Sequence, residues 1–355
     1  MKIGLITFHD TTNFGSLLQT YGLYKAIVNC DKQCEIIDYQ CQSIVERELP
    51  PRFRFTLNIR KLLRQFLIIP TCRRKHNALS VFLTQNMHLS GKFTRETIHN
   101  ANNQYDKFIV GSDIVWGLDI TKGDTAYFLD FVKGKSKKYA FASSIGNPWS
   151  EDEKTKIKPL LNDFNHICVR EEESAEWVEE LTKKRPDVVS DPTMLLNPTE
   201  WKDIASDKYK GRKYVFLYFN DSNNTCLTKA KEYAKSQNIE VLYVNYGKPI
   251  KGVKSIRPYS IADFLSLILY AQHIFTSSYH GMLFSIYFQK QFIFFNRAHK
   301  SRMNTLAKKL NIYHCNGADV DTKNLPIIDY SAVNQAVSVY RNYSLDRLKH
   351  ILTLE

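Results

Sequence analysis

The chain has 355 residues, of which 43% are hydrophobic and 24% charged, an ordinary composition for globular domains. This length predicts two domains. The seven cysteines are odd in number and scattered and never form a CxxC pair, which argues against a disulfide framework or zinc site and favours a reducing compartment. We expect neither a signal peptide nor a membrane span, and therefore a cytoplasmic protein.

The net charge of +13 is concentrated in one window. No acidic residue lies between Glu48 and Glu96, whereas Leu57–Ile69 combines a helical apolar pattern with basic residues. Such a segment predicts peripheral contact with an anionic membrane through residues 52–75, at the inner face of the plasma membrane. The alternative is the solvated face of a helical insertion. Nucleic acid is not expected as a partner, because no binding motif accompanies the charge. The basic residues of the window are Arg52, Arg54, Arg60, Lys61, Arg64, Arg73, Arg74, Lys75, Lys92 and Arg95.

The chain begins with a predicted βαβ unit, which starts a parallel sheet. Its parts are a strand at 2–8, a helix at about 17–28 and a strand at 34–39. The loop between the first strand and the helix contains only Gly15, so a GxGxxG dinucleotide site is not indicated. Asn13, Ser16 and Gln19 offer hydrogen bonds at the start of the helix. A plain connecting loop is the alternative.

A second polar turn follows the predicted buried strand 107–110, which runs directly into Gly111, Ser112 and Asp113. Ligands of parallel sheets collect at the carboxyl ends of the strands, so Asp113 lies where chemistry is expected. Trp116, three residues later, offers a stacking surface for a sugar ring. The alternative is a helix N-cap formed by Ser112 or Asp113.

The alternation of strands and helices continues to the C-terminus and predicts two α/β domains. We expect an N-terminal domain at 1–195 with a basic helical insertion at about 50–95, and a C-terminal domain at 196–330. Residues 331–355 are expected to form a helix that packs back on the first domain. The further strands are predicted at 138–142, 166–170, 188–190, 213–219, 240–245, 273–276 and 292–295, and the further helices at 225–236, 261–270, about 279–289 and about 301–310.

The third polar turn joins the predicted strand 273–276 to an apolar helix through Ser277, Ser278, Tyr279, His280 and Gly281. The N–H groups and dipole at the start of a helix hold anions. His280 can act there as a donor, an acid or a base near neutral pH, and Gly281 allows close approach of a ligand or of another backbone. The alternative is an ordinary junction with a capping serine and a packed histidine.

Six stretches in this order resemble the polysaccharide pyruvyl transferase family, over residues 1 to about 310. Each is weak alone, and the order makes the resemblance specific. They are Thr12-Asn13-Phe14-Gly15-Ser16-Leu17-Leu18-Gln19, the run from Tyr105 to Trp116, the run from Tyr139 to Gly146, Val169-Arg170-Glu171, Asp191-Pro192-Thr193, and the run from Ser278 to Ser285.

The resemblance implies two Rossmann-like domains in a GT-B-like arrangement with a cleft between them. It implies transfer of the enolpyruvyl group of phosphoenolpyruvate to a sugar of a bacterial surface polysaccharide (exopolysaccharide) or its lipid-linked precursor. The products are a pyruvate ketal and phosphate. Phosphoenolpyruvate is then a donor substrate, with no separate cofactor, and no metal site is expected.

The resemblance gives His280 a role, and the chemistry of phosphoenolpyruvate suggests roles for the other candidate residues. His280 matches the histidine that holds phosphoenolpyruvate, and Ser278 stands where one branch of the family has an arginine. Arg302 or Arg257 is expected to supply positive charge there. Asp113 is expected to accept a proton from the sugar hydroxyl. Asn13, Gln19 and Trp116 are expected to shape the acceptor side, with Ser16, Ser112, Ser277 and Gly281 as further substrate-binding residues.

Two other interpretations stay open at this point. The first is a GT-B glycosyltransferase that uses a nucleotide-sugar and releases a nucleotide instead of inorganic phosphate. The second is a non-catalytic binding protein of a polysaccharide gene cluster, with a decayed site. The serine at 278 favours the second slightly, whereas the presence of His280, Asp113 and the Asn13 loop argues against it.

Overall fold

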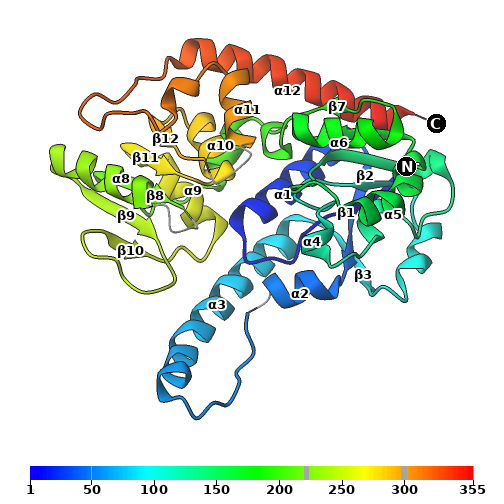
Figure 1. Cartoon of the computed structure of the whole chain (residues 1–355), viewed down its shortest axis with the longest axis horizontal. Helices are drawn as coiled ribbons and strands as arrows, with labels where there is room; N and C mark the ends of the chain where they lie inside the picture. Colours follow the sequence, from blue (N-terminus) through cyan, green and yellow to red (C-terminus); the bar gives the residue numbers. More distant parts are fainter. Residues whose placement is uncertain (49, 220–223, 297–301, 355) are drawn as a thin grey trace. The chain divides into compact units, whose positions relative to one another are not determined.

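A computed structural model describes residues 1–48, 50–219, 224–296 and 302–354 (Figure 1). The chain divides into two compact units. Unit 1 contains Met1–Pro51, Leu79–Leu196 and Val339–Glu355, and unit 2 contains Arg52–Ala78 and Asn197–Ser338. The basic segment 52–78 therefore belongs to unit 2, whereas the sequence placed the whole insertion in the first domain. The start predicted for a helix at residue 301 lies outside the described residues.

Unit 1 is built on a parallel sheet with the strand order β3-β2-β1-β4-β5-β6-β7. Its inner strands β1, β4 and β5 are almost continuously apolar and buried, as a sheet covered on both faces requires. The strands are β1 (Lys2–Ile6), β2 (Gln33–Tyr39), β3 (Leu89–Phe93), β4 (Lys107–Val110), β5 (Lys138–Ser143), β6 (His166–Val169) and β7 (Asp187–Val188).

Helices flank this sheet (Figure 1). They are α1 (Phe14–Val28), α2 (Gln42–Glu48), the C-terminal part of α3 (Ile59–Asn86), α4 (Leu118–Thr121), α5 (Glu151–Asn162), α6 (Glu172–Thr182) and the C-terminal part of α12 (Tyr330–Thr353). Within unit 1, α12 is tied to the sheet because the buried Lys107 ammonium donates to the carbonyl of Ile351 at 3.0 Å. Ser344 Oγ accepts from the backbone N–H of Ser190 at 2.9 Å.

Unit 2 has a second parallel sheet with the order β10-β9-β8-β11-β12. Its strands are β8 (Tyr214–Tyr218), β9 (Glu240–Val244), β10 (Lys254–Ile256), β11 (His273–Thr276) and β12 (Phe292–Phe294). Its helices are α7 (Pro198–Ile204), α8 (Asn224–Ser236), α9 (Ile261–Leu269), α10 (Tyr279–Tyr287), α11 (Arg302–Lys309) and the remaining parts of α3 and α12. Ser260 caps α9 by accepting from the N–H of Asp263.

The first part of α3 is anchored to unit 2 by its basic side chains. The Arg74 guanidinium lies 4.5 Å from the centre of the Tyr259 ring, and Lys75 Nζ lies 4.5 Å from that of Tyr246. Such cation–π contacts attach the first part of α3 to the segments around Tyr246 and Tyr259. In the described part of the chain, none of the helices combines the length and hydropathy that a membrane span needs.

Candidate functional site

The polar turns of unit 1 meet where the order of the strands reverses. The chain passes from β1 to β2 on one side and returns to β4 on the other side of β1. The loops that follow β1 and β4 are therefore neighbours, at the position where open α/β sheets bind ligands. Ser16, at the start of α1, donates from Oγ to Asp113 Oδ2 at 2.6 Å and closes this junction.

Asp113 adopts a strained backbone conformation, with φ of +77°. Residues other than glycine rarely occupy this region, and they persist there when their surroundings hold them, often at functional sites. Its Oδ1 accepts from the N–H of Ile114 at 2.8 Å, and its carbonyl accepts from the N–H of Ser144 at 3.0 Å. The half-buried carboxylate is thus held in one orientation.

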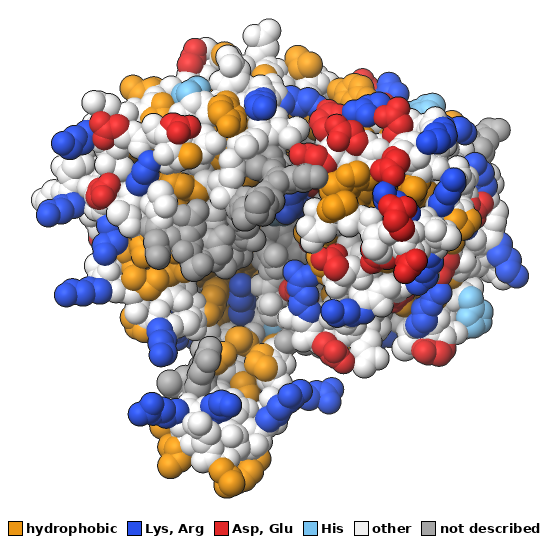
Figure 2. All heavy atoms as spheres, in the orientation of Figure 1, with side chains coloured by type: hydrophobic (Ala, Val, Ile, Leu, Met, Phe, Trp, Pro, Cys, Tyr) orange, Lys and Arg blue, Asp and Glu red, His pale blue; other side chains and the backbone are white. Residues whose placement is uncertain are grey.

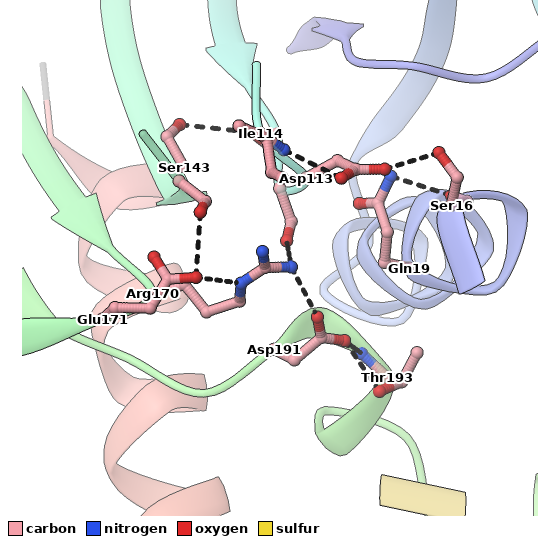
Figure 3. A network of polar contacts seen from close by, with 12 residues as sticks. Ser16, Gln19, Asp113, Ile114, Ser143, Arg170, Glu171, Asp191 and Thr193 are labelled. Carbon is pink, nitrogen blue, oxygen red and sulfur yellow. Dashed lines mark hydrogen bonds and ion pairs between the residues drawn. The ribbon is translucent and has the colours of Figure 1, made fainter. Parts of the chain in front are cut away.

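A buried network of charged side chains contacts the turn that contains Ser112 and Asp113. Arg170 donates from Nη1 to Ser112 Oγ at 3.1 Å and to Asp191 Oδ2 at 3.0 Å, and from Nε to Glu171 Oε1 at 2.9 Å. Thr193 donates from its N–H and hydroxyl to Asp191 Oδ1 at 3.0 and 2.7 Å. Figure 3 shows Arg170 between Glu171 and Asp191, with Ser16, Gln19 and Asp113 nearby. The network connects the ends of β4, β6 and β7.

A second buried polar pair lies at the ends of β1 and β2. His9 Nε2 is 3.1 Å from Asp38 Oδ1, and the His9 side chain is only 3% exposed. Burial by itself would raise the pKa of Asp38, but the hydrogen bond and charge of His9 and the hydrogen bond from Gln40 hold it below its usual value. This carboxylate therefore stays ionised at neutral pH beside the loop of Asn13.

The polar turn of unit 2 also lies where the strand order reverses, between β8 and β11. The Thr276 hydroxyl and the N–H of Ser277 both donate to the carbonyl of Tyr218 on β8, at 2.7 and 3.1 Å. Ser278 caps α10, because its Oγ accepts from the N–H of Gly281 at 3.3 Å. The positive end of the α10 dipole is thereby directed at this turn.

Groups that suit an anion gather at this helix start. Ser277 is 2% exposed, and among the described residues its Oγ has no hydrogen-bond partner. The half-buried His280 ring lies edge-on to that of Tyr279, with 5.7 Å between the ring centres. The Arg302 guanidinium, at the start of α11, is 5.5 Å from the centre of the Tyr279 ring. Hydroxyl, imidazole and guanidinium groups therefore occur together in unit 2, whereas Arg257 lies exposed on the segment after β10.

The structure changes the roles of several predicted residues. The sequence proposed Trp116 as a sugar-stacking surface, but its ring is fully buried, stacks on Phe128 with ring centres 5.5 Å apart and donates to the Tyr127 carbonyl. Trp116 is therefore part of the hydrophobic core of unit 1. Gly281 does not make room for a ligand: a Cβ there would lie 2.5 Å from Thr276 Oγ1, so glycine is required by packing.

Three predicted ligand contacts are internal supports. Gln19 and Ser112 are fully buried and Ser16 is 3% exposed. Gln19 donates to the Ser16 carbonyl at 2.8 Å and to Thr7 Oγ1 at 3.2 Å, while Ser112 Oγ accepts from Arg170. These residues hold Asp113 in place. Asn13, the N-cap of α1, is exposed and keeps its predicted role as a proposal.

The charged residues beneath Asp113 were missed as site residues, although Arg170, Glu171 and Asp191 lie within the motifs of the family resemblance. Glu171 is the N-cap residue of α6. In the structure its Oε1 accepts from Ser144 Oγ at 2.8 Å and from Arg170. One signal in the sequence could have indicated this network. Charged residues and small hydroxyl residues both occur directly after the predicted strands.

One group of metal-ligand types occurs among the described residues. The side chains of His166, Cys168 and Asp187 lie within 4.8 Å of one another. However, Asp187 already accepts from Tyr343 at 2.6 Å and lies 3.7 Å from Arg347, and burial raises the pKa of the Cys168 thiol. The Asp187 carboxylate therefore already has a hydroxyl donor and a guanidinium beside it. The group holds α12 against β6 and β7.

Comparison with solved structures defines the fold class. The chain is similar to the UDP-N-acetylglucosamine 2-epimerase from Rickettsia bellii, at 10% identity and a TM-score of 0.53, with 99% of this chain and 96% of that chain covered. It is also similar to UDP-GlcNAc 2-epimerase from Neisseria meningitidis bound to UDP-GlcNAc, at 10% identity and a TM-score of 0.51, with 100% and 95% covered. The two Rossmann-like units and these likenesses confirm the predicted GT-B fold class.

The family model for polysaccharide pyruvyl transferase matches residues 13–299, more than half of the chain. The chain therefore belongs to the polysaccharide pyruvyl transferase family, as the sequence motifs predicted. A search of curated proteins finds no match. Family membership makes the protein a polysaccharide-modifying transferase.

Proposed function

We propose that this protein transfers the enolpyruvyl group of phosphoenolpyruvate to a sugar of a surface polysaccharide or its lipid-linked precursor. The observation that carries the proposal is the position of the two predicted catalytic residues. Asp113 and the His280 turn each lie at the strand-order reversal of their own unit, where α/β sheets bind ligands. The family match over residues 13–299 supports the same chemistry.

Unit 2 is proposed to hold the donor. Phosphoenolpyruvate carries a phosphate and a carboxylate, and both need several donors and positive charge. The start of α10, the buried Ser277 hydroxyl and Arg302 supply these in one place. Arg302 thereby provides the charge that one branch of the family takes from the position of Ser278. His280, when protonated, donates to the phosphate or transfers its proton to C3.

Unit 1 is proposed to activate the acceptor. Asp113 accepts the proton of a sugar hydroxyl while the oxygen of that hydroxyl attacks C2 of phosphoenolpyruvate. C3 gains the proton that His280 donates and becomes a methyl group, and the proton that Asp113 accepted passes to solvent, from which His280 regains one. A second hydroxyl of the same sugar then attacks C2, the bond from C2 to the phosphate oxygen breaks, and phosphate leaves with a proton. One new bond to each hydroxyl oxygen gives the cyclic ketal. Asn13 is proposed to hydrogen-bond to the sugar.

A glycosyltransferase that uses a nucleotide-sugar is the second candidate. The epimerases to which the chain is similar act on UDP-N-acetylglucosamine by name, and the start of a helix also suits a diphosphate. At 10% identity, however, this likeness shows the fold alone. The family match therefore favours phosphoenolpyruvate.

Incubation of the protein with phosphoenolpyruvate and a panel of sugar acceptors tests the proposal. The expected result is release of inorganic phosphate that depends on the acceptor, with a pyruvate ketal on the product in mass spectrometry. The Asp113→Asn variant is the control, because asparagine retains the backbone preference and hydrogen-bonding size of aspartate but cannot act as a base. Nucleotide release from a nucleotide-sugar, with no phosphate from phosphoenolpyruvate, would establish the second candidate instead.

A further inference from the structure

Unit 2 carries an exposed apolar surface at the beginning of α3, which we call the 53–66 surface. Leu57 is 90% exposed, Phe55 80% and Ile59 71%. Single exposed apolar residues are ordinary on protein surfaces, but a group within one short segment indicates an interaction site. The exposed large hydrophobic residues of this surface are Phe53, Phe55, Leu57, Ile59, Leu63 and Phe66.

The segment that presents these side chains is held in place by specific contacts. The Gln65 side chain accepts from the N–H of Arg54 at 2.7 Å and donates to the carbonyl of Arg54 at 2.8 Å. The rings of Phe53 and Phe66 pack with their centres 5.3 Å apart. Asn58 Oδ1 accepts from the N–H of Lys61 at 3.1 Å, which caps the start of α3. The chain thus folds back along the helix and exposes its apolar side chains while its polar groups pair internally.

Positive charge surrounds the apolar side chains. Arg52, Arg54, Arg60 and Lys61 are exposed, and the sequence has no acidic residue from 49 to 95. Figure 2 shows hydrophobic side chains at the lower end of the molecule with Lys and Arg side chains directly beside them. The combination of exposed apolar side chains and exposed cations is complementary to a surface with an anionic outer layer and an apolar interior.

We propose that the 53–66 surface docks on an anionic lipid bilayer. Arg52, Arg54, Arg60 and Lys61 contact the lipid phosphates, and the apolar side chains enter the boundary between headgroups and acyl chains. Nucleic acid would match the charge but would leave Leu57 and Ile59 without apolar partners. Electrostatic attraction and insertion of apolar side chains are each weak, but together they attach a protein to a membrane stably and reversibly. That the docked protein meets a lipid-linked acceptor rests on the proposed function, whereas the docking itself does not.

Co-sedimentation of the whole protein with vesicles tests this inference. The vesicles contain phosphatidylcholine alone or mixed with phosphatidylglycerol. We expect binding to the anionic vesicles that salt weakens and little binding to the neutral ones. The Phe55→Ser/Leu57→Ser variant is expected to bind at least about tenfold more weakly. Replacing the four named cations by glutamine should weaken binding by more than about a hundredfold, since each contributes roughly fivefold.

Matched controls separate docking from general surface effects. Ile327 and Val339 are 82% and 66% exposed and lie outside the surface, so Ile327→Ser/Val339→Ser should bind as the unmodified chain does. Anionic vesicles should shift the tryptophan emission of a Leu57→Trp variant to the blue. They should cause no such shift in an Ile327→Trp variant.

No binding of the unmodified chain, or equal binding by Phe55→Ser/Leu57→Ser, would overturn the proposal. So would binding to duplex DNA without binding to vesicles. Phosphoenolpyruvate is absent throughout, so failure of docking leaves the proposed reaction untouched.

Discussion

The buried Arg170 network is predicted to be a main support of unit 1, and the Arg170→Met substitution tests this. Methionine preserves most of the aliphatic volume but removes the cation between Glu171 and Asp191. The side chains of Arg170, Glu171 and Asp191 are 1%, 6% and 0% exposed. Water therefore cannot solvate the two carboxylates that lose their cationic partner. Removing one partner of a buried ion pair typically costs about 3–5 kcal/mol of unfolding free energy.

The remaining hydrogen bonds of the two carboxylates determine where in this range the loss of unfolding free energy is expected. Asp191 keeps two hydrogen bonds from Thr193, and Glu171 keeps one from Ser144 at 2.8 Å and one from Ser174 at 3.2 Å. These neutral donors stabilise the remaining carboxylates, so we expect a loss near the lower limit, about 3 kcal/mol. For a domain of roughly 150–250 residues this lowers the unfolding temperature by about 6–12 °C.

Urea unfolding followed by tryptophan fluorescence measures this loss. Trp116, Trp149 and Trp177 all lie in unit 1, so the signal reports chiefly on that unit. Arg185→Met is the matched control, because Arg185 contacts Glu179 at 2.7 Å and Glu172 at 3.0 Å but is 46% exposed. Its substitution should leave the midpoint almost unchanged. If both variants shift the midpoint equally, burial of the Arg170 network does not determine its contribution.

Three further predictions concern the strand ends. Asp113→Asn should lower turnover by about 10²–10⁴-fold without changing the unfolding midpoint, measured by phosphate release and urea unfolding. Burial lowers the pKa of His273 to about 4, so unit 2 should lose stability as the pH falls from about 6.5 toward 4, by about 3 kcal/mol, in urea unfolding at successive pH values. The sign follows because the unfolded state binds the proton more tightly. Gly281→Ala should destabilise unit 2 by about 1–3 kcal/mol, since its Cβ would meet Thr276 Oγ1.

Each of the three has a control and a contradicting result. Unchanged turnover in Asp113→Asn would exclude Asp113 as the base. His273→Phe should flatten the pH dependence of unfolding, because phenylalanine fills the space between Tyr233 and Phe275 without titrating. The same slope in this variant and the unmodified chain would contradict the assignment. Gly91 is exposed with open space around it, so Gly91→Ala should be tolerated far better than Gly281→Ala. Equal effects would refute the packing argument.

Much of the fold followed from the sequence, because the inner strands are short apolar runs between polar turns. β4 and β11 occur at the predicted positions, Lys107–Val110 and His273–Thr276. The edge strands β3 and β10 were missed. In β3, Leu89–Phe93, only Phe93 is buried, and β10 has only three residues. Neither therefore shows the buried apolar pattern that identifies a strand.

The positions of the polar turns were predictable, but the contacts of their side chains were not. The polar loops after β1 and β4 were recognised from their residue types, and the structure joins them through Ser16 and Asp113. Whether a side chain at such a turn faces solvent or core depends on tertiary packing, and this is why Trp116 was misassigned. Arg170 and Asp191 are 21 residues apart, and only the pairing of β6 with β7 brings them together.

Binding of phosphoenolpyruvate to the purified protein tests the central claim most directly. Calorimetric titration should show saturable binding that the His280→Ala variant loses, while its unfolding midpoint stays unchanged. That result would place the donor at the start of α10. Absence of binding at millimolar phosphoenolpyruvate, with acceptor fragments also present, would contradict the claim and direct attention to nucleotide-sugars.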